Sequence, residues 1–209
     1  SKYINGNSNS ISGVITDGGT FKWETEKYPG MRDFVKFGPF AYTAKLRNGL
    51  FRNTGACLSP QNAFLNSIGL ETLGLRMERI CDNAMQLAAY IEENYEDITV
   101  NYAGLKSSSW HEIAASQFDG HYGGIFTLRL GSKERAFAFI NALKYPLKVS
   151  NIGDTKSLVI HPESTISVHS TEEEKRAGGV FDDLVRISVG IEDIDDLIWD
   201  FKQAIESLS

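Results

Sequence analysis

A long amphipathic helix is the feature that most constrains the fold of this chain. Its start is marked by Ser59 and Pro60, a serine that caps helices and a proline that suits the first helical position. Apolar side chains then recur every three or four residues as far as Ile91, which predicts about 30 residues of helix. The expected positions of a bend are Gly69 and Gly74. A helix of this length is long enough to link two domains.

Alternating strand and helix patterns follow this helix and predict an α/β sandwich. The expected strands cover residues 98–100, 125–130, 147–149, 157–160 and 184–189. The expected helices begin at Ser132, at Thr171, which has the spacing of a capping box, and at Ile194. Acidic residues gather at the start of the last helix, where the helix dipole favours them.

The segment ahead of the long helix has no regular period. Residues 13–16 are expected to form a short strand, followed by a turn at residues 17–19. Residues 21–55 carry many aromatic side chains among glycines and prolines. Such a segment is typical of an irregular excursion that covers a pocket or a subunit contact.

Charge and cysteine content limit the partners of the chain. The 209 residues carry a formal net charge of −6, which argues against a nucleic-acid-binding surface. No apolar run approaches the roughly 20 residues of a membrane span, so no membrane partner is expected. Two cysteines, Cys57 and Cys81, cannot by themselves form a disulfide framework or a four-ligand zinc site. We therefore expect two buried thiols in a reducing compartment, and no metal site.

The residues alone leave the role of three polar features open. Arg186 lies in an apolar run, and a buried guanidinium needs an anionic partner. That partner is either a structural carboxylate or the carboxylate of a substrate, which suits the bidentate fork. Residues 150–154 form either an ordinary turn or a group of polar side chains oriented into a pocket. Lys2 by itself is an unremarkable terminal lysine.

Several short blocks occur in one order along the whole chain. They are SKYINGN (1–7), GVI (13–15), GACLSP (55–60), GLETL (69–73), LRMER (75–79), NA (83–84), SNIGD (150–154), SLVIHP (157–162), ST (164–165) and RISVGIED (186–193). In these blocks the chain resembles the C-terminal half of the pyridoxal-phosphate-dependent enzymes of cysteine and methionine metabolism. The ordered set is far more specific than any single block.

Within that family the chain resembles the O-acetylhomoserine sulfhydrylase branch most. The resemblance rests on the aromatic excursion after residues 17–19 and on residues 151–154. Two departures concern substrate and thiol preference. Family members often have Gly-Gly-His where this chain has residues 5–7, and many have Thr-Thr-His where Ser164-Thr165 is followed by isoleucine.

The resemblance implies an α/β fold, namely the PLP-dependent transferase fold type I. Residues 1–78 would then form the end of the large cofactor domain and the linking helix, and residues 79–209 the small C-terminal α/β domain. The implied cofactor is pyridoxal 5'-phosphate.

The resemblance also assigns roles to five residues. Lys2 becomes the catalytic Schiff-base lysine, and Ser1 contacts the cofactor phosphate. Arg186 becomes the clamp for the substrate α-carboxylate, with Asn151 beside it and Ser150 near the lysine.

The implied reaction is a γ-replacement in methionine biosynthesis. It converts O-acetylhomoserine and sulfide, supplied free or by a sulfur carrier, to homocysteine and acetate. Alternatives are a γ-synthase or γ-lyase of the same family, such as cystathionine γ-synthase or methionine γ-lyase, and a non-catalytic domain fragment. The implied partners are a small amino-acid substrate, the N-terminal half of the same enzyme and further copies in a homotetramer. The expected location is cytoplasmic.

Overall fold

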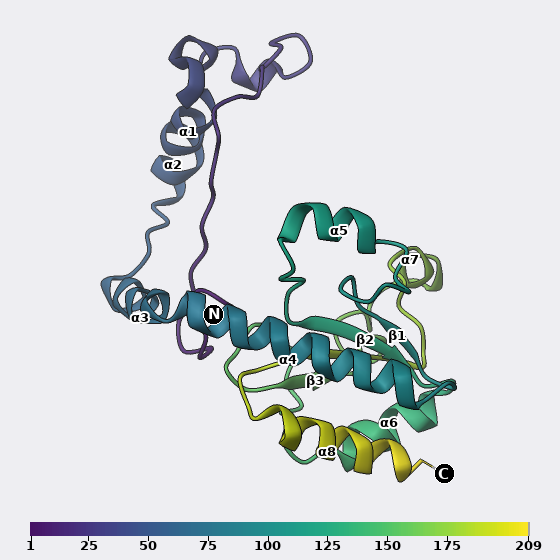
Figure 1. Ribbon diagram of the computed structural model, residues 1–209. Coiled ribbons are helices and arrows are strands. Elements are labelled where there is room, and N and C mark those ends of the chain that lie inside the picture. The colour runs from purple at the N-terminus through teal and green to yellow at the C-terminus, as the bar shows by residue number, and fades with distance from the viewer. Residues whose placement is uncertain (209) are drawn as a thin grey trace. The chain divides into compact units, whose positions relative to one another are not determined.

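The computed structural model describes residues 1–208 of the chain (Figure 1). These residues form two compact units. The larger one contains Ser1–Ser10 and Leu65–Ser209, and the smaller one contains Ile11–Phe64. The expected boundary between residues 78 and 79 concerns the domains of a whole enzyme and stays a prediction.

An antiparallel sheet of four strands forms the centre of the larger unit. The strands are β1 (Thr99–Asn101), β2 (Ile125–Arg129), β3 (Leu158–Ile160) and β4 (Leu184–Ser188). Their order in the sheet is β1-β2-β4-β3, so β4 is a central strand. In the register of the sheet, Arg186 of β4 lies opposite Thr127 of β2 and Ile160 of β3.

Three helices cover one face of this sheet: α4 (Leu73–Asn94), α6 (Lys133–Ala142) and α8 (Ile194–Glu206) (Figure 1). Side chains alternate between the two faces of a strand, so Val185 and Ile187 of β4 lie in the core beneath the helices. Arg186, between them, lies on the other face. The helices α4 and α8 are amphipathic and bury their apolar stripes in the same core.

The predicted long helix is present but is divided in two. Helix α3 (Pro60–Glu71) begins at the expected proline, and α4 follows after Thr72, whose backbone leaves the helical region at φ −110° and ψ 5°. The break therefore lies between the two glycines. At one of them, Gly69, an added Cβ would meet the backbone oxygen of Asn5 at 2.5 Å, so the helix and the N-terminal loop approach closely there.

The predicted helix starts of the second half are confirmed by their caps. The hydroxyl of Ser132 accepts a hydrogen bond from the amide of Arg135 at the start of α6. Thr171 and Glu174 form the capping box of α7 (Glu172–Ala177). Asp193 caps α8. Helix α5 (His111–Phe118) was not predicted from the sequence.

Two predicted strands are wrong. Residues 147–149 make one isolated bridge, from Leu147 to Leu158, and both Leu147 and Val149 are nearly half exposed. Residues 13–16 form no strand, and Val14 is 70% exposed. Both runs are rich in β-branched or aliphatic residues, yet neither run buries one of its faces. Without such burial, the β-propensity of a short run is too weak to form a strand.

The smaller unit consists of short helical turns around an aromatic cluster. The turns are η1 (Pro29–Met31), η2 (Val35–Phe40), α1 (Ala41–Leu46), η3 (Arg47–Phe51) and α2 (Arg52–Thr54). The rings of Phe21, Trp23, Tyr28 and Tyr42 pack with centroid separations between 4.6 and 6.0 Å. Residues 21–55 thus lack a regular sequence period, as expected, but their second half is largely helical.

Two further observations bear on the expectations. Of the two cysteines, Cys81 is buried on α4, but Cys57 is exposed, because it lies in the non-helical stretch between α2 and α3. The expectation of two buried thiols is therefore wrong for Cys57. Among residues 1–208, no helix has both the length and the apolar character needed to cross a membrane.

Candidate functional site

The N-terminal loop, defined as residues 1–10, lies against a second loop, residues 150–156, in the larger unit. The side-chain amide of Asn151 donates hydrogen bonds to the Ser1 carbonyl at 3.2 Å and to the Ser8 hydroxyl at 2.6 Å. The Thr155 amide donates to the Gly6 carbonyl at 2.8 Å. Two segments about 150 positions apart in the sequence therefore share one hydrogen-bonded surface.

Arg186 contacts the same surface from the sheet. Its guanidinium is half-buried and donates to the backbone carbonyl of Asn151 at 3.4 Å. Within residues 1–208 it has no carboxylate within ion-pair distance. Burial lowers the pKa of Arg186 from its ordinary value. Since a structural carboxylate partner is lacking in this part of the chain, the arrangement favours the alternative in which the anion comes from outside.

Hydrogen bonds link three of the predicted site residues, Ser1, Asn151 and Arg186. Asn151 connects Ser1 on one side with Arg186 on the other, each through one hydrogen bond. Ser150 is adjacent to Asn151 in sequence and exposed. Lys2 follows Ser1, its side chain is exposed, and its carbonyl accepts from the Gly6 amide at 2.7 Å.

The loop of residues 150–156 is held above the sheet by two close contacts. The Gly153 amide donates to the hydroxyl of Ser188, which lies on the same face of β4 as Arg186. Gly153 has φ +71°, and an added Cβ would meet the ring of Tyr3 at 2.7 Å. A side chain at this position would therefore be strained and would displace the residue next to Lys2.

Asp154 is a buried carboxylate that sequence reasoning did not single out. It accepts hydrogen bonds from the Ser8 hydroxyl at 2.7 Å and the Lys156 amide at 3.0 Å. Burial acts to raise the pKa of Asp154, but the hydrogen bonds from Lys156 and Ser8 outweigh it, and the pKa lies below its ordinary value. The charged carboxylate thereby fixes Ser8, which binds Asn151. An aspartate directly after a glycine turn was the available signal.

Arg76 is the second residue that was missed. It lies near the start of α4, is 6% exposed, and donates to the backbone carbonyls of Tyr3 and Ile4 in the N-terminal loop. An arginine on a helix face that is otherwise apolar was the signal for it. This residue belongs to the block LRMER (75–79), but the resemblance in that block gives it no role.

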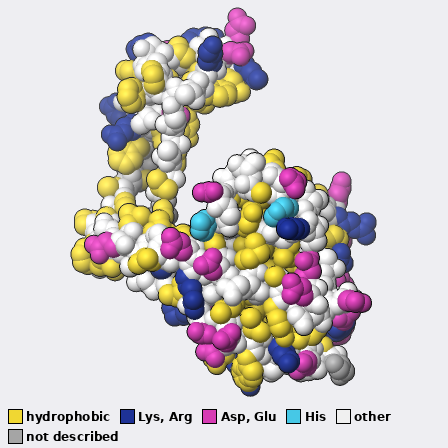
Figure 2. Space-filling view, viewed as in Figure 1, with side chains coloured by type: hydrophobic (Ala, Val, Ile, Leu, Met, Phe, Trp, Pro, Cys, Tyr) yellow, Lys and Arg dark blue, Asp and Glu magenta, His cyan; other side chains and the backbone are white. Residues whose placement is uncertain are grey.

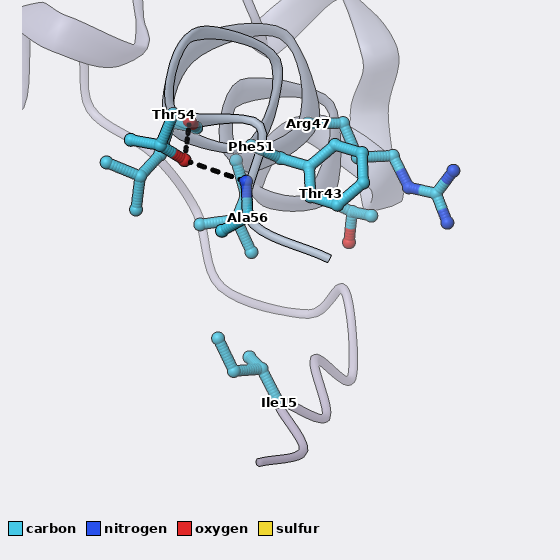
Figure 3. A pocket seen from close by; sticks show the side chains of 8 residues that line it. Ile15, Thr43, Arg47, Phe51, Thr54 and Ala56 are labelled. Atoms are coloured by element: carbon cyan, nitrogen blue, oxygen red, sulfur yellow. Dashed lines mark hydrogen bonds between the residues drawn. The ribbon is translucent and has the colours of Figure 1, made fainter. Parts of the chain in front are cut away.

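A separate apolar groove of about 400 Å³ lies within the smaller unit (Figure 3). It is lined by Ile15, Thr43, Leu46, Arg47, Leu50, Phe51, Thr54 and Ala56. The Thr54 hydroxyl donates to the Leu50 carbonyl and accepts from the Ala56 amide, so this polar group of the wall has partners within the smaller unit. None of the predicted site residues lines this groove.

No group of three or more histidine, cysteine, aspartate or glutamate side chains suited to a metal ion occurs in the described part of the chain. An ion-pair cluster does occur away from the predicted site residues. In it, Glu163 binds Lys175 at 2.7 Å and Lys133 at 2.9 Å, and Lys175 also binds Glu172.

Known proteins are similar to this chain in sequence and in fold. The sequence model of the family described as "Cys/Met metabolism PLP-dependent enzyme" matches residues 1–206. The homocysteine synthase of Schizosaccharomyces pombe is 39% identical over 98% of this chain and 51% of that protein. The O-acetyl-L-homoserine sulfhydrylase of Corynebacterium glutamicum is 38% identical over 96% of this chain and 49% of that protein. The chain thus spans about half the length of the curated relatives that it matches.

Solved structures agree with these relatives. The O-acetylhomoserine sulfhydrylase of Wolinella succinogenes has a TM-score of 0.73 and 38% identity, over 90% of this chain and 50% of that chain. A Campylobacter jejuni protein described as an O-acetylhomoserine (thiol)-lyase has a TM-score of 0.75 and 37% identity, over 79% of this chain and 39% of that chain. That structure carries a pyridoxyl-lysine phosphate. The expected fold, PLP-dependent fold type I, is confirmed.

Proposed function

We propose that this chain, which belongs to the Cys/Met metabolism family of pyridoxal-phosphate-dependent enzymes, supplies the cofactor lysine and the substrate-binding arginine of an O-acetylhomoserine sulfhydrylase. One observation carries the proposal. Asn151 joins the residue before Lys2 to Arg186 by hydrogen bonds, and Arg186 has no carboxylate partner in the described residues. An active site of this family that processes amino acids needs a primary amine, and it needs a guanidinium that is free to bind a carboxylate.

The donor set fits pyridoxal phosphate. Lys2 offers an exposed amine that makes no hydrogen bond or ion pair with another described residue, and Ser1 offers a hydroxyl beside it for the phosphate. When bound, the cofactor supplies an electron sink for the carbanion chemistry that no side chain performs. Arg186 would bind the α-carboxylate of the substrate with its bidentate fork. Asn151 and Ser150 would line the same side of the site.

The proposed reaction is the replacement of acetate by sulfide. Lys2 removes the proton from Cα of O-acetylhomoserine and returns protons to the substrate as the reaction proceeds. The bond between Cγ and the acetate oxygen breaks, and a bond between Cγ and sulfur forms, which gives homocysteine and acetate. Arg186 holds the carboxylate so that the Cα–H bond keeps one orientation, a positioning contribution. The supporting facts are the relatives named O-acetylhomoserine sulfhydrylase or homocysteine synthase.

The rest of the site is proposed to come from other polypeptide. Because the chain covers about half of its relatives, we infer that a polypeptide equivalent to their N-terminal half completes the cofactor site. The apolar groove of the smaller unit, which Leu50 lines at 65% exposure, and the exposed Phe40 at 70% offer a surface for it. Figure 2 draws the hydrophobic side chains at the surface in yellow. We further propose homotetrameric assembly and a cytoplasmic location, as the resemblance implies.

Replacement of Lys2 tests this function. In the protein at its full encoded length, Lys2→Ala is expected to abolish the visible absorbance of the lysine-bound cofactor and the production of homocysteine. Lys106→Ala, which changes another exposed lysine of the larger unit, is the control and should keep both. A persistent absorbance band in Lys2→Ala would reject the assignment.

The sulfur nucleophile separates the alternatives within the family. With O-acetylhomoserine as substrate, a sulfhydrylase uses sulfide and a γ-synthase uses cysteine, while a γ-lyase releases an oxo acid without either. If the protein were active with cysteine and inactive with sulfide, its proposed function would change from sulfhydrylase to γ-synthase. If the full-length protein did not bind the cofactor, the remaining hypothesis would be that the chain is a non-catalytic fragment.

A further inference from the structure

The guanidinium of Arg76 is surrounded by oxygen acceptors that carry no charge. Its Nε donates to the Thr72 hydroxyl at 3.1 Å, and one terminal nitrogen donates to the Tyr3 carbonyl at 2.8 Å. The other terminal nitrogen donates to the carbonyls of Gly69 at 2.7 Å and Ile4 at 3.3 Å. All three nitrogens of the fork are therefore engaged by two segments, the N-terminal loop and the junction of α3 and α4.

Burial of this cation costs desolvation free energy, which an apolar side chain at the same position would not. Removal of an arginine charge from water is unfavourable unless its donors are satisfied, and a carboxylate is the usual partner. Here none lies within ion-pair distance in the described residues. Burial lowers the pKa of Arg76, and the charge of Asp154 opposes that shift. The donors bind the carbonyls of the two residues that directly follow Lys2.

Two glycines let the backbone lie close to the guanidinium and to the loop that it binds. Gly6 has φ +76°, and a Cβ there would lie 2.4 Å from the nearest terminal nitrogen of Arg76. A Cβ at Gly69 would lie 2.6 Å from the Ile4 carbonyl oxygen. The amide of Gly6 in turn donates to the Lys2 carbonyl. Arg76 thus holds two backbone carbonyls inside the turn that begins at Lys2 and ends at Gly6.

We propose that Arg76 is a positioning residue for Lys2. By holding the carbonyls of Tyr3 and Ile4, it keeps the lysine amine in one place relative to Asn151 and Arg186. It touches neither cofactor nor substrate and acts through the loop. This inference rests on the proposed function of Lys2, because a fixed position matters only if that amine performs chemistry. A displacement of a reacting group by about 1 Å costs up to about 100-fold in rate.

The test uses the full-length protein loaded with cofactor and three variants. Arg76→Lys keeps the charge but replaces a planar fork with a point donor that cannot span the four acceptors. Thr72→Val removes the acceptor of Nε, together with the hydroxyl's own 3.4 Å hydrogen bond to the Gly69 carbonyl, and retains the shape of the side chain. Arg79→Lys is the matched control, since Arg79 lies one turn further along α4 and its side chain is 45% exposed.

Three readouts are followed: the pH midpoint of the visible cofactor band, kcat and KM for O-acetylhomoserine, and hydrogen exchange of the Gly6 amide. For Arg76→Lys we expect kcat to fall about tenfold or more with KM changed less than about threefold, since positioning of the amine acts on the chemical step. The band midpoint should shift, and the Gly6 amide should exchange faster. Thr72→Val should change the same quantities less, and Arg79→Lys should match the wild type.

A merely structural arginine would change stability but would leave the band midpoint and the ratio of kcat to KM effects unaltered. If Arg76→Lys, or Thr72→Val where Arg76→Lys does not fold, matches Arg79→Lys in midpoint and kcat, the positioning role is rejected. The Lys2→Ala variant is measured in parallel. Loss of its band with an unchanged Arg76→Lys profile rejects only the role of Arg76, whereas a retained band in Lys2→Ala rejects the proposed function as well.

Discussion

At the scale of single residues, the arginines differ in what they bind. Arg129 pairs with Asp183 and Arg135 with Asp97, as surface arginines commonly do. Arg186 has a backbone carbonyl as its one hydrogen-bond partner among the described residues. It lies at the middle of a central strand, on the face away from the helices, so its backbone is held by hydrogen bonds to both neighbouring strands. Such a guanidinium is suited to a carboxylate from solution.

Truncation of Arg186 tests that interpretation. We expect Arg186→Ala to raise KM for the amino-acid substrate by tenfold or more, which corresponds to about 1.4 kcal/mol or above. Arg79→Ala, an exposed arginine of α4, serves as the control and should leave KM within about twofold. Steady-state kinetics of the full-length enzyme provide the measurement, and an unchanged KM in Arg186→Ala would remove this residue from the site.

Glu163 illustrates a charge whose effect is on stability. Hydrogen bonds from Lys175 and Lys133 lower the pKa of Glu163 to about 2. Because this value lies below the unfolded value of about 4.3, the stabilisation is fully present above about pH 4.3 and is lost as the pH falls through about 2.

Glu163→Gln should therefore have a lower free energy of unfolding than the wild type at neutral pH. The difference should narrow steadily as the pH falls below about 4.3, because the wild type loses its advantage there. Urea unfolding at several pH values measures it, with Glu93→Gln, an exposed glutamate of α4, as the control. A difference that stays constant down to about pH 3 would show that the ion pairs do not shift this carboxyl.

What the sequence revealed about single residues depended on the chemistry of each type. An arginine in an apolar strand needs an anionic partner because its desolvation is costly. The sequence therefore singled out Arg186 but left open whether that anion is structural or a substrate, and its site role stays a prediction. Lys2 was singled out only through the resemblance, because a lysine acquires a function from its surroundings, and Asn151, which binds the residue before it, lies 150 positions away in the sequence. The role of Arg76 was not predicted, because the backbone carbonyls that it binds are present in every residue and leave no signature in the sequence.

At the scale of elements, local rules predicted helix starts well and short strands poorly. Ser132, Thr171 and Asp193 cap helices through hydrogen bonds that their own sequence neighbours supply. A strand needs a partner elsewhere in the chain, which the run at 147–149 does not obtain beyond one bridge. The break between α3 and α4, at Thr72, lies three residues from a tertiary contact, the close approach of the N-terminal loop to Gly69.

Two glycines of the long helical region give a matched test of that contact. An added Cβ at Gly69 meets the backbone of Ile4 and Asn5, whereas at Gly74 nothing lies within 4 Å. Gly69→Ala should therefore lose about 1–3 kcal/mol of stability through overpacking. Gly74→Ala should gain up to about 1 kcal/mol through helix propensity.

Urea unfolding of the two glycine variants supplies the comparison. The account expects effects of opposite sign, with cofactor affinity reduced only in Gly69→Ala, because that variant displaces the loop that carries Lys2. Equal stabilities for Gly69→Ala and Gly74→Ala would show that the loop does not pack tightly against α3.

At the scale of the whole molecule, the larger unit has a conventional core and the smaller unit does not. Fully buried side chains such as Phe126, Leu128 and Phe201 fill the space between the sheet and its helices. In Ile11–Phe64 only Met31 and Ala41 are buried among the hydrophobic residues, while large apolar side chains are exposed. An apolar surface of this kind marks an interaction site. The sequence pointed to it through aromatic content without regular period, but the helical turns there could not be predicted.

The isolated chain is therefore expected to associate with itself. Sedimentation velocity of residues 1–209 over a range of concentrations should show a rising average mass, and Leu50→Glu should reduce the effect. Asn53→Asp adds the same charge to an exposed position of α2 without removing apolar surface, so it is the control. Addition of the complementary half of the enzyme should suppress the association. A chain that stays monomeric at every concentration would show that this surface is inert.

The central claim is that the amine of Lys2 binds the cofactor aldehyde. The most direct measurement is borohydride reduction of the cofactor-loaded, full-length protein, followed by peptide mapping by mass spectrometry. We expect one pyridoxyl group per chain, attached to the lysine of the peptide that contains Ser-Lys-Tyr-Ile. A pyridoxyl group on any other lysine, or none after reduction of a protein that retains its visible band, would contradict it.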